Sequence, residues 1–294
     1  NITDQIVVTG TVDMNSTGTY LLTYSVQDEA GNTATATRTV TVVGNRTVDL
    51  NDSVAMDMIW CPPGTFTMGS PTTEVGRVDD ETEHNVSLTR GFYLGKYEVT
   101  QTQYEAVMTG NPNNLSPTPS NWPNNPDRPV EKVSWDDAQV FLTRLNEQQA
   151  GSLPAGWIYV LPTESQWEYA CRAGTTTAYS WGDNITSTNA NWNHGIDNPN
   201  QTIDVGGFTA NPWGFFDMHG NVWEWTADAY QATYPTGNPV INPTNPGTSG
   251  SNRVRRGGGW STFPQDLRCA RRGSVEQDGH YNWLGFRVSL QKSQ

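Results

Sequence analysis

The sequence predicts an α+β protein in which a small all-β unit precedes a larger, irregular domain with few helices. Residues 1–43 alternate apolar and polar side chains with a period of two, which is typical of antiparallel strands. Farther along, three short segments combine a capping residue with the apolar spacing of a helix. The 294 residues also include 28 glycines, 18 prolines and 12 tryptophans, a composition that favours short strands and long ordered loops.

The N-terminal β unit is expected over residues 1–46. A first strand should run from 6–8 into 11–12, followed by strands at 19–26 and 34–43. Three strands cannot close a two-sheet sandwich, which needs about seven. Either the sequence begins within this domain, or a strand from another chain completes it. We expect a polar linker at 47–55.

The second domain is expected over residues 56–294. Strands are predicted within 56–70, at 92–99 and at 157–161. Thr100, Ser134 and Thr163 each precede a helical pattern and are expected to act as N-caps. The corresponding helices should begin at 101, 135 and 164, and Gly174 should end the last of them.

Charge and hydropathy exclude several classes of partner. The chain has a net charge of −13 and only three lysines, whereas nucleic-acid binding needs clustered cations. An acidic surface instead fits a soluble extracellular protein and attracts divalent cations. No apolar run reaches the length of a membrane span. We therefore expect no nucleic-acid partner and no membrane span.

The stretch GFFDMHGNVWEWTAD, residues 214–228, places acids among aromatic residues. A buried carboxylate is costly unless it is paired or bound to a metal. Asp217 and Glu224 flank a Gly220-Asn221 turn, and carboxylates with backbone carbonyls at short spacing form an oxygen cage that suits calcium. The alternative is a core strand with one acid paired to an arginine. The pattern alone leaves both interpretations open.

Seven motifs identify a family when taken in order. They are MDMIWCPPGTFTMGS, FYLGKYEVTQTQYEAVM, RPVEKVSWDDAQVF, LPTESQWEYACRAG, GFFDMHGNVWEWTAD, RVRRGGGW and LGFR. Together they resemble the formylglycine-generating-enzyme, or sulfatase-modifying-factor, domain over roughly residues 56–290. The resemblance implies a large, irregular variant of the C-type-lectin fold, commonly calcium-bound. Residues 18–43 resemble the C-terminal half of bacterial immunoglobulin-like surface domains.

The resemblance also implies metal sites and a disulfide. The main calcium site would use side chains and carbonyls of four residues: Asp217, Gly220, Val222 and Glu224. A second site, in a loop that is shorter here than in the family, would use Asn191, Trp192, Asp197 and Pro199. Cys171 and Cys269 match a family disulfide, which leaves Cys61 as a free, buried thiol.

The catalytic residues of the family do not carry over. The enzyme is a copper oxidase with two cysteines just after a Gly-Gly-x-Tyr/Trp strand. Here Thr262 matches the first cysteine, and the second falls in a shorter segment without one. Thiolates hold Cu(I) and hydroxyls do not replace them. We therefore expect no catalytic residues of this kind and no copper.

The segment after Trp260 is a candidate ligand surface, because aromatic residues and arginines in loops are typical of binding sites. It resembles the diversified C-terminal segment of retroelement-variable proteins, which use the same fold. The alternative is a loop packed on the core, with Arg268 and Arg271 in structural salt bridges. The candidate ligand residues are Ser261, Phe263, Asp266, Arg272, Glu276, His280, Tyr281 and Trp283.

These expectations combine into one functional prediction. We expect a secreted, calcium-stabilised, non-catalytic member of this family, located outside the cell or at its surface. Its partner would be a protein or a glycan, with self-assembly through the N-terminal β unit as a further possibility. The alternative is a formylglycine-generating type of oxidase, or a sulfatase activator, that works through other residues.

Overall fold

The computed structural model describes residues 6–13, 16–195 and 199–293. The chain divides into two compact units, residues 1–45 and residues 46–294. The N-terminal unit is a three-stranded antiparallel sheet with strand order β1-β2-β3. Its strands are β1 (Val7–Thr9), β2 (Gly18–Gln27) and β3 (Thr33–Val42).

The β2–β3 hairpin accounts for most of the N-terminal unit. Its register runs from Gly18 opposite Val42 to Gln27 opposite Thr33. Asp28 closes the turn, because its Oδ1 accepts hydrogen bonds from the backbone N–H groups of Ala30 and Asn32. The predicted strands are therefore confirmed in outline, although residues 11–12 have no regular structure. Apolar side chains remain exposed on this sheet, and Leu21 is 58% exposed.

The predicted linker at 47–55 is wrong. These residues lie within a hairpin of the larger unit, formed by β4 (Arg46–Asn51) and β5 (Val54–Cys61). Val48 and Leu50 are buried in the main core, and Oδ1 of Asn51 accepts hydrogen bonds from the N–H groups of Ser53 and Val54. The alternation of apolar and polar residues at 47–51 was the signal for a strand.

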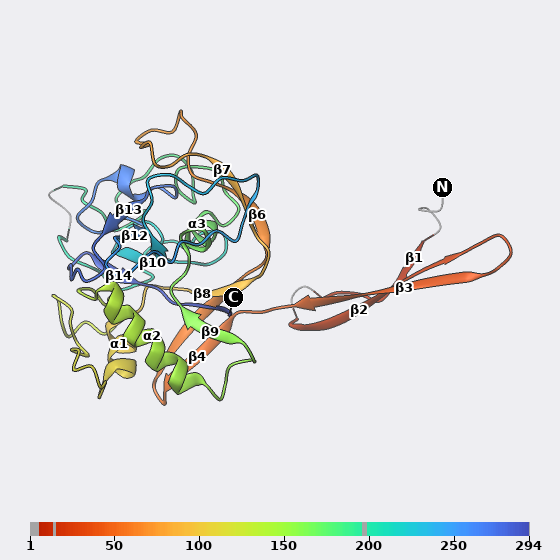
Figure 1. The fold of residues 1–294 in the computed structure, drawn as a ribbon, viewed down its shortest axis with the longest axis horizontal. Coiled ribbons are helices and arrows are strands. Elements are labelled where there is room, and N and C mark those ends of the chain that lie inside the picture. Colours follow the sequence, from red (N-terminus) through yellow and green to blue (C-terminus); the bar gives the residue numbers. More distant parts are fainter. Residues whose placement is uncertain (1–5, 14–15, 196–198, 294) are drawn as a thin grey trace. The chain divides into compact units, whose positions relative to one another are not determined.

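The larger unit contains a five-stranded sheet with order β4-β5-β8-β15-β9. Helices α1 and α2 pack against each other, with α1 contacting β4 and β5 and α2 contacting β9 (Figure 1). The predicted caps Thr100, Ser134 and Thr163 all form capping boxes. The remaining elements named here are β8 (Phe92–Gly95), β9 (Trp157–Val160), β15 (Ser289–Lys292), α1 (Gln101–Met108) and α2 (Trp135–Gln149).

A four-stranded sheet with order β13-β12-β10-β14 carries the aromatic stretch found in the sequence. Its strand β10 pairs antiparallel with β12 and parallel with β14. Helix α3 packs against β10, and all of its residues are buried. These elements are α3 (Glu164–Arg172), β10 (Trp223–Ala229), β12 (Arg253–Arg256), β13 (Gly273–Val275) and β14 (Leu284–Phe286).

The rest of the unit is mostly irregular. A small sheet has the order β11-β7-β6, and the described residues between α3 and β10 form neither helix nor strand. This long loop region holds both predicted calcium segments. No helix in the described part of the chain is long and apolar enough to cross a membrane. The remaining elements are β6 (Gly64–Met68), β7 (His84–Leu88), β11 (Val240–Ile241) and the 3-10 helix η2 (Pro264–Leu267).

Candidate metal and ligand-binding sites

The loop that leads into β10 follows a strained path. Asp217 and Asn221 adopt left-handed conformations, with φ of 56° and 64°, which are uncommon for residues other than glycine. Gly220 has a φ of 108°, and a Cβ atom there would lie 2.4 Å from the carbonyl oxygen of Asn191. Only glycine therefore allows this close approach. The contact brings the two predicted calcium segments together.

Glu224 shows the arginine pairing that the sequence left open. Its carboxylate is fully buried and accepts hydrogen bonds from Nε and Nη2 of Arg287, each at 2.6 Å. The indole Nε1 of Trp167 donates to the same carboxylate at 2.8 Å. Such a two-pronged arginine pair satisfies a buried carboxylate without a metal. The proposed role of Glu224 as a calcium ligand therefore remains a prediction.

Two further carboxylates lie near this ion pair. Glu98, which the sequence analysis missed, is fully buried and accepts hydrogen bonds from the N–H of Val222 at 3.0 Å and from Nδ2 of Asn221 at 2.7 Å. Burial raises the pKa of Glu98 well above its usual value, and the negative charges of Asp217 and Glu224 raise it further. Residues 92–99 were expected to form a strand, and nothing in that pattern indicated that Glu98 would be buried near other acids.

Asp217 is the third carboxylate, and it is only half-buried. Its Oδ2 accepts a hydrogen bond from the N–H of Gly206 at 2.6 Å. Burial raises its pKa to about 6, although the charge of Arg287 opposes that shift. Glu98, Asp217 and Glu224 thus act electrostatically on one another, and Arg287 is the cation that acts on all three. The raised pKa values favour the neutral acids, and a divalent cation would instead stabilise these carboxylates in their ionised form.

The second predicted calcium segment contributes a buried oxygen without a donor. The Nδ2 of Asn191 donates to the carbonyl of Gln201 at 3.0 Å and to Oδ1 of Asn221 at 3.2 Å. Within the described residues, no donor reaches Oδ1 of Asn191. Oxygen atoms of this kind fit an oxygen-seeking cation. Of the other residues predicted for this site, Trp192 is half-buried and Pro199 is exposed. Asp197 lies outside the described residues.

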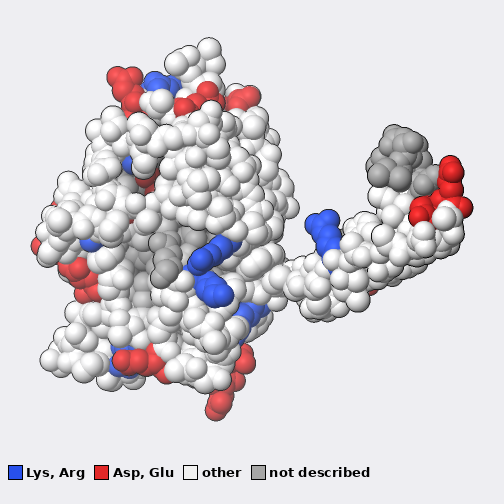
Figure 2. All heavy atoms as spheres, turned by 45° about the vertical axis from the view of Figure 1, so that its right-hand side comes forward, with Lys and Arg blue, Asp and Glu red and all other residues white. Residues whose placement is uncertain are grey.

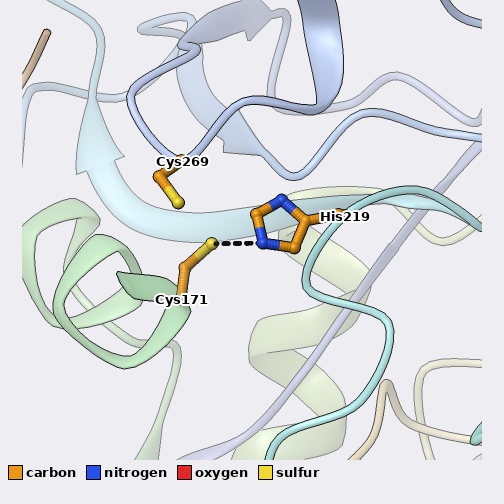
Figure 3. Close-up of side chains that lie close together, drawn as sticks. All are labelled: Cys171, His219 and Cys269. Atoms are coloured by element: carbon orange, nitrogen blue, oxygen red, sulfur yellow. Dashed lines mark hydrogen bonds between the residues drawn. The ribbon is translucent and has the colours of Figure 1, made fainter. Parts of the chain in front are cut away.

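The three cysteines are free, buried thiols in this structure. Cys171 from α3 and Cys269 lie close together beside His219, and the Sγ of Cys171 is 3.6 Å from Nε2 of His219 (Figure 3). The expected pair is therefore brought together, but the disulfide is not formed here. That bond remains a prediction for the oxidised protein.

The loop residues around Trp260 and Trp283 form a semi-exposed aromatic group. The indole Nε1 of Trp260 donates to the carbonyl of Asn282 at 3.0 Å and so joins the two segments. The rings of Tyr281 and Trp283 stack with a centroid separation of 4.5 Å, and Trp122 lies edge-on to Trp260 at 5.3 Å. We call Trp122, Trp260, Tyr281 and Trp283 the aromatic surface. The sequence analysis missed Trp122 and Trp260.

The other predicted ligand residues divide into exposed and structural ones. Glu276 and His280 are exposed, as is Phe263 at 55%. Ser261 and Asp266 are half-buried, and Asp266 forms a salt bridge with Arg271 at 3.0 Å. The remaining one, Arg272, is considered separately because it faces inward.

Arg272 corrects the predicted ligand surface. Its side chain is buried and forms a salt bridge with Glu164 of α3 at 2.6 Å. Arg268 is buried likewise, against Glu81 at 2.7 Å. The alternative of structural salt bridges therefore holds for this part of the loop. Glu81 is itself fully buried.

The position that matches the first catalytic cysteine of the resembled family carries an engaged hydroxyl. Oγ1 of Thr262 accepts a hydrogen bond from the N–H of Gly259 at 3.0 Å and donates to the carbonyl of the same residue at 2.9 Å. Thr262 thus closes a tight turn. A hydroxyl that is used in this way offers no soft ligand for Cu(I).

Part of the positive charge is buried inside the molecule. Arg256, Arg268 and Arg287 are buried and paired with acids. On the face shown in Figure 2, basic side chains are few, and the acidic ones are scattered without merging into one patch. Such a face lacks the clustered cations that phosphate backbones attract.

Comparisons with known proteins agree with the motif resemblance. The signature described as "Sulfatase-modifying factor enzyme 1-like domain" matches residues 46–292, and one described as "Bacterial surface protein, Ig-like domain" matches residues 1–42. The formylglycine-generating enzyme of Mus musculus is 27% identical over 291 residues, covering 79% of this chain and 74% of that protein. That of Streptomyces coelicolor is 33% identical over 180 residues, covering 56% and 53%.

Solved structures show the same architecture. PvdO from Pseudomonas aeruginosa superposes with a TM-score of 0.74 at 26% identity, covering 85% of this chain and 99% of that one. Treponema denticola variable protein 1 gives a TM-score of 0.67 at 25% identity, covering 83% and 98%. The fold expected for residues 56–294 is thereby supported, and it begins earlier than expected, at residue 46.

Proposed function

The chain belongs to the family of sulfatase-modifying factor enzyme 1-like domains, and we propose that it acts within this family as a calcium-stabilised, non-catalytic binding protein at the cell surface. The surface location is supported by the match of residues 1–42 to a bacterial surface immunoglobulin-like domain. The ligand would be an extracellular protein or glycan.

The observation that carries the binding proposal is the rigid support of the aromatic surface. The N–H of Lys132 donates to the carbonyl of Tyr281 at 3.0 Å, and the N–H of Trp135 donates to that of Gln277 at 2.9 Å. The guanidinium of Arg255 lies 4.7 Å from the centre of the Trp283 ring and packs against it. Tryptophan and tyrosine that are fixed before binding lose little entropy on contact with a ligand.

The aromatic surface can be tested directly. Labelled protein should bind a subset of a glycan array, or of immobilised envelope proteins, and Trp283→Ala should weaken that binding at least about tenfold. Trp181→Ala is the matched control, since Trp181 is an exposed tryptophan outside the aromatic surface. Equal binding by wild type and Trp283→Ala would remove the aromatic surface from the proposal.

The second candidate function is an oxidase of the formylglycine-generating type, or a sulfatase activator, and the names of the curated relatives favour it. Thr262 opposes it, because a threonine hydroxyl in a closed turn replaces the thiolate. Mass spectrometry of a cysteine-containing peptide incubated with the protein, copper and oxygen distinguishes the two. We expect an unchanged peptide, and a copper-dependent aldehyde product would establish the enzyme instead.

Calcium would supply structural stability in this proposal. The residues proposed to hold it are Asp217, Gly220, Val222 and Glu224, with Asn191 at the adjoining segment. Their support is the group of neighbouring carboxylates, Glu98, Asp217 and Glu224, and the oxygen of Asn191 that lacks a donor among the described residues. Glu224 would have to share its oxygens with Arg287. Hard cations such as calcium accept carboxylate, amide and backbone oxygens together.

A further inference from the structure

Asp217 and Asn221 place oxygen atoms on the loop at 217–222, which we call the oxygen-rich loop. Cys171, His219 and Cys269 form a separate group of metal-ligand type, to which the same loop contributes His219. All three side chains are buried. Their ligand atoms lie within 4.8 Å of one another, and in the described part of the chain no other three His, Cys, Asp or Glu residues meet that closely. Figure 3 shows the two sulfur atoms and the imidazole pointing toward a shared centre. We call these three residues the thiol–imidazole cluster.

The separation of Cys171 and His219 matches a tetrahedral zinc site. Zinc bonds of about 2.3 Å to sulfur and about 2.0–2.1 Å to nitrogen, at a tetrahedral angle, separate the two ligand atoms by about 3.6 Å. The Sγ of Cys171 lies 3.6 Å from Nε2 of His219. The backbone therefore already presents this pair at the required separation.

The tautomer of His219 also suits a metal. Its Nδ1 lies 2.7 Å from the carbonyl oxygen of Leu267, and because a carbonyl only accepts, Nδ1 must carry the proton. The N–H of Ser180 donates to Nε2 from 3.2 Å, so Nε2 carries a lone pair, and a bound metal would replace that donor. A histidine fixed through its other ring nitrogen to a carbonyl is the usual arrangement behind a metal ligand.

The charge balance of the thiol–imidazole cluster also suits a zinc ion. Arg172 is a nearby cation for both thiols. Two thiolates and one Zn²⁺ sum to zero charge, which is the least costly state for a buried site.

We propose that the thiol–imidazole cluster binds one Zn²⁺ in the reduced protein, through Sγ of Cys171, Sγ of Cys269 and Nε2 of His219. Zinc binding releases the thiol protons and leaves the oxidation state of both sulfur atoms unchanged. The hydroxyl of Ser180, 3.1 Å from Nε2, is the nearest side-chain oxygen for a fourth position. The same two sulfurs cannot form a disulfide while they hold the ion.

The test uses the full chain, reduced and freed of metal, in excess calcium so that hard-cation sites are filled. Zinc alone is titrated and the bound metal is counted by elemental mass spectrometry. We expect the wild type to bind one equivalent of zinc. The zinc affinity should fall by more than about tenfold in Cys171→Ser and in Cys269→Ser. Cys61→Ser is the matched control, because Cys61 is equally buried but lies outside the cluster, and it should bind as wild type does.

Cobalt decides the matter even if a serine variant fails to fold. Co²⁺ in the wild-type protein should give thiolate charge-transfer absorption and the strong visible bands of a tetrahedral site, and zinc should remove both. Zinc loading should also protect Cys171 and Cys269 from an oxidant that otherwise links them, as read by non-reducing peptide mapping. Reduced wild-type protein that binds no zinc, or that shows no thiolate band with cobalt, overturns the proposal.

Discussion

His219 of the thiol–imidazole cluster lies two residues from both Asp217 and Asn221 of the oxygen-rich loop, but the two sites offer opposite chemistry. Asn221 contacts Glu98 and Asn191, and Asp217 accepts a hydrogen bond from Gly206, whereas His219 between them lies beside two thiols. Hard oxygen ligands select calcium, and thiolates with imidazole select zinc. One strained loop can therefore serve two sites because successive side chains leave it in different directions.

The two regions also differ in what balances their charge. Beside the oxygen-rich loop, Arg287 already pairs with Glu224 and leaves Glu98 and Asp217 without a full positive partner. At the thiol–imidazole cluster the bound ion itself supplies the balancing charge, because metal binding releases the thiol protons. Stability of the first region should therefore respond to any change in charge, while that of the second should respond mainly to zinc and to oxidation.

The largest effect should come from removing Arg287, which pairs with Glu224 beside the oxygen-rich loop. Arg287→Ala leaves the carboxylate of Glu224 buried without its partner, beside two more acids. Breaking such a buried pair costs about 3–5 kcal/mol. Urea denaturation measures the loss.

Arg128→Ala is the matched control for that experiment. Arg128 makes a looser pair with Asp204 at 3.8 Å, and the side chain of Asp204 is 71% exposed. An exposed pair of this kind contributes about 0–1 kcal/mol. If both arginine variants unfolded at the same urea concentration, Arg287 would not be the residue that balances these carboxylates.

Calcium should stabilise the protein by mass action. Because the ion binds the folded state, calcium at about one hundred times its dissociation constant adds about 2.7 kcal/mol. A calcium-selective chelator should lower the melting temperature of the wild type, and Asp217→Asn should reduce that response. Cys171→Ser should retain it, since thiols do not hold calcium. A melting temperature that ignores both calcium and chelator would argue against the site.

A smaller effect should appear with pH in the calcium-free protein. The folded pKa of Asp217, about 6, exceeds the ordinary value of 3.8. The folded state therefore holds its proton more tightly than the unfolded state does, and stability falls as pH rises from about 4 through about 6. Asp228 and Glu131, each with a pKa raised to about 7 by burial, act in the same direction up to that pH.

Asp217→Asn should flatten the lower part of this pH profile, and calcium should do so as well. Chemical denaturation between pH 5 and 7 provides the measurement. A calcium-free wild type whose stability rises across this interval would contradict the raised pKa of Asp217. Cys61→Ser is the control and should keep the wild-type pH profile, because Cys61 takes no part in either region.

Local sequence rules predicted the elements with local causes. The capping boxes at Thr100, Ser134 and Thr163 depend on residues three apart, so the sequence contains all of their information. Residues 47–55 were taken for a linker, and the β4–β5 hairpin was missed. The polar residues of this stretch masked the burial of Val48 and Leu50 in the main core. Hydrophobic alternation was present there, but charged neighbours reduced its contrast.

The sites depend on contacts that span the chain, and the sequence predicted them only in part. Glu98 meets Asn221 across more than a hundred residues, and nothing near Glu98 marks it as buried. Arg272 looked like a surface ligand because its run, RCARRG, is rich in arginine, although α3 supplies Glu164 as its partner. The motif resemblance brought Cys171 and Cys269 together, whereas His219 between them had no metal-ligand spacing in the sequence.

The smallest effect on both regions should come from removing the N-terminal unit. Residues 46–294 form a compact unit that contains all residues of the oxygen-rich loop and of the thiol–imidazole cluster. Deletion of residues 1–45 should therefore leave calcium-dependent melting and zinc stoichiometry unchanged.

We expect a difference in self-assembly. Val7, Val8 and Leu21 are exposed on the N-terminal sheet, and apolar surface in contact with water costs about 25 cal/mol per Å². An unpaired strand edge also invites a strand from a second copy. Light scattering of the full chain should then report oligomers that disappear on deletion. A full chain that stays monomeric would refute strand donation, and a deletion that changed either metal response would show that the N-terminal unit contributes to the sites.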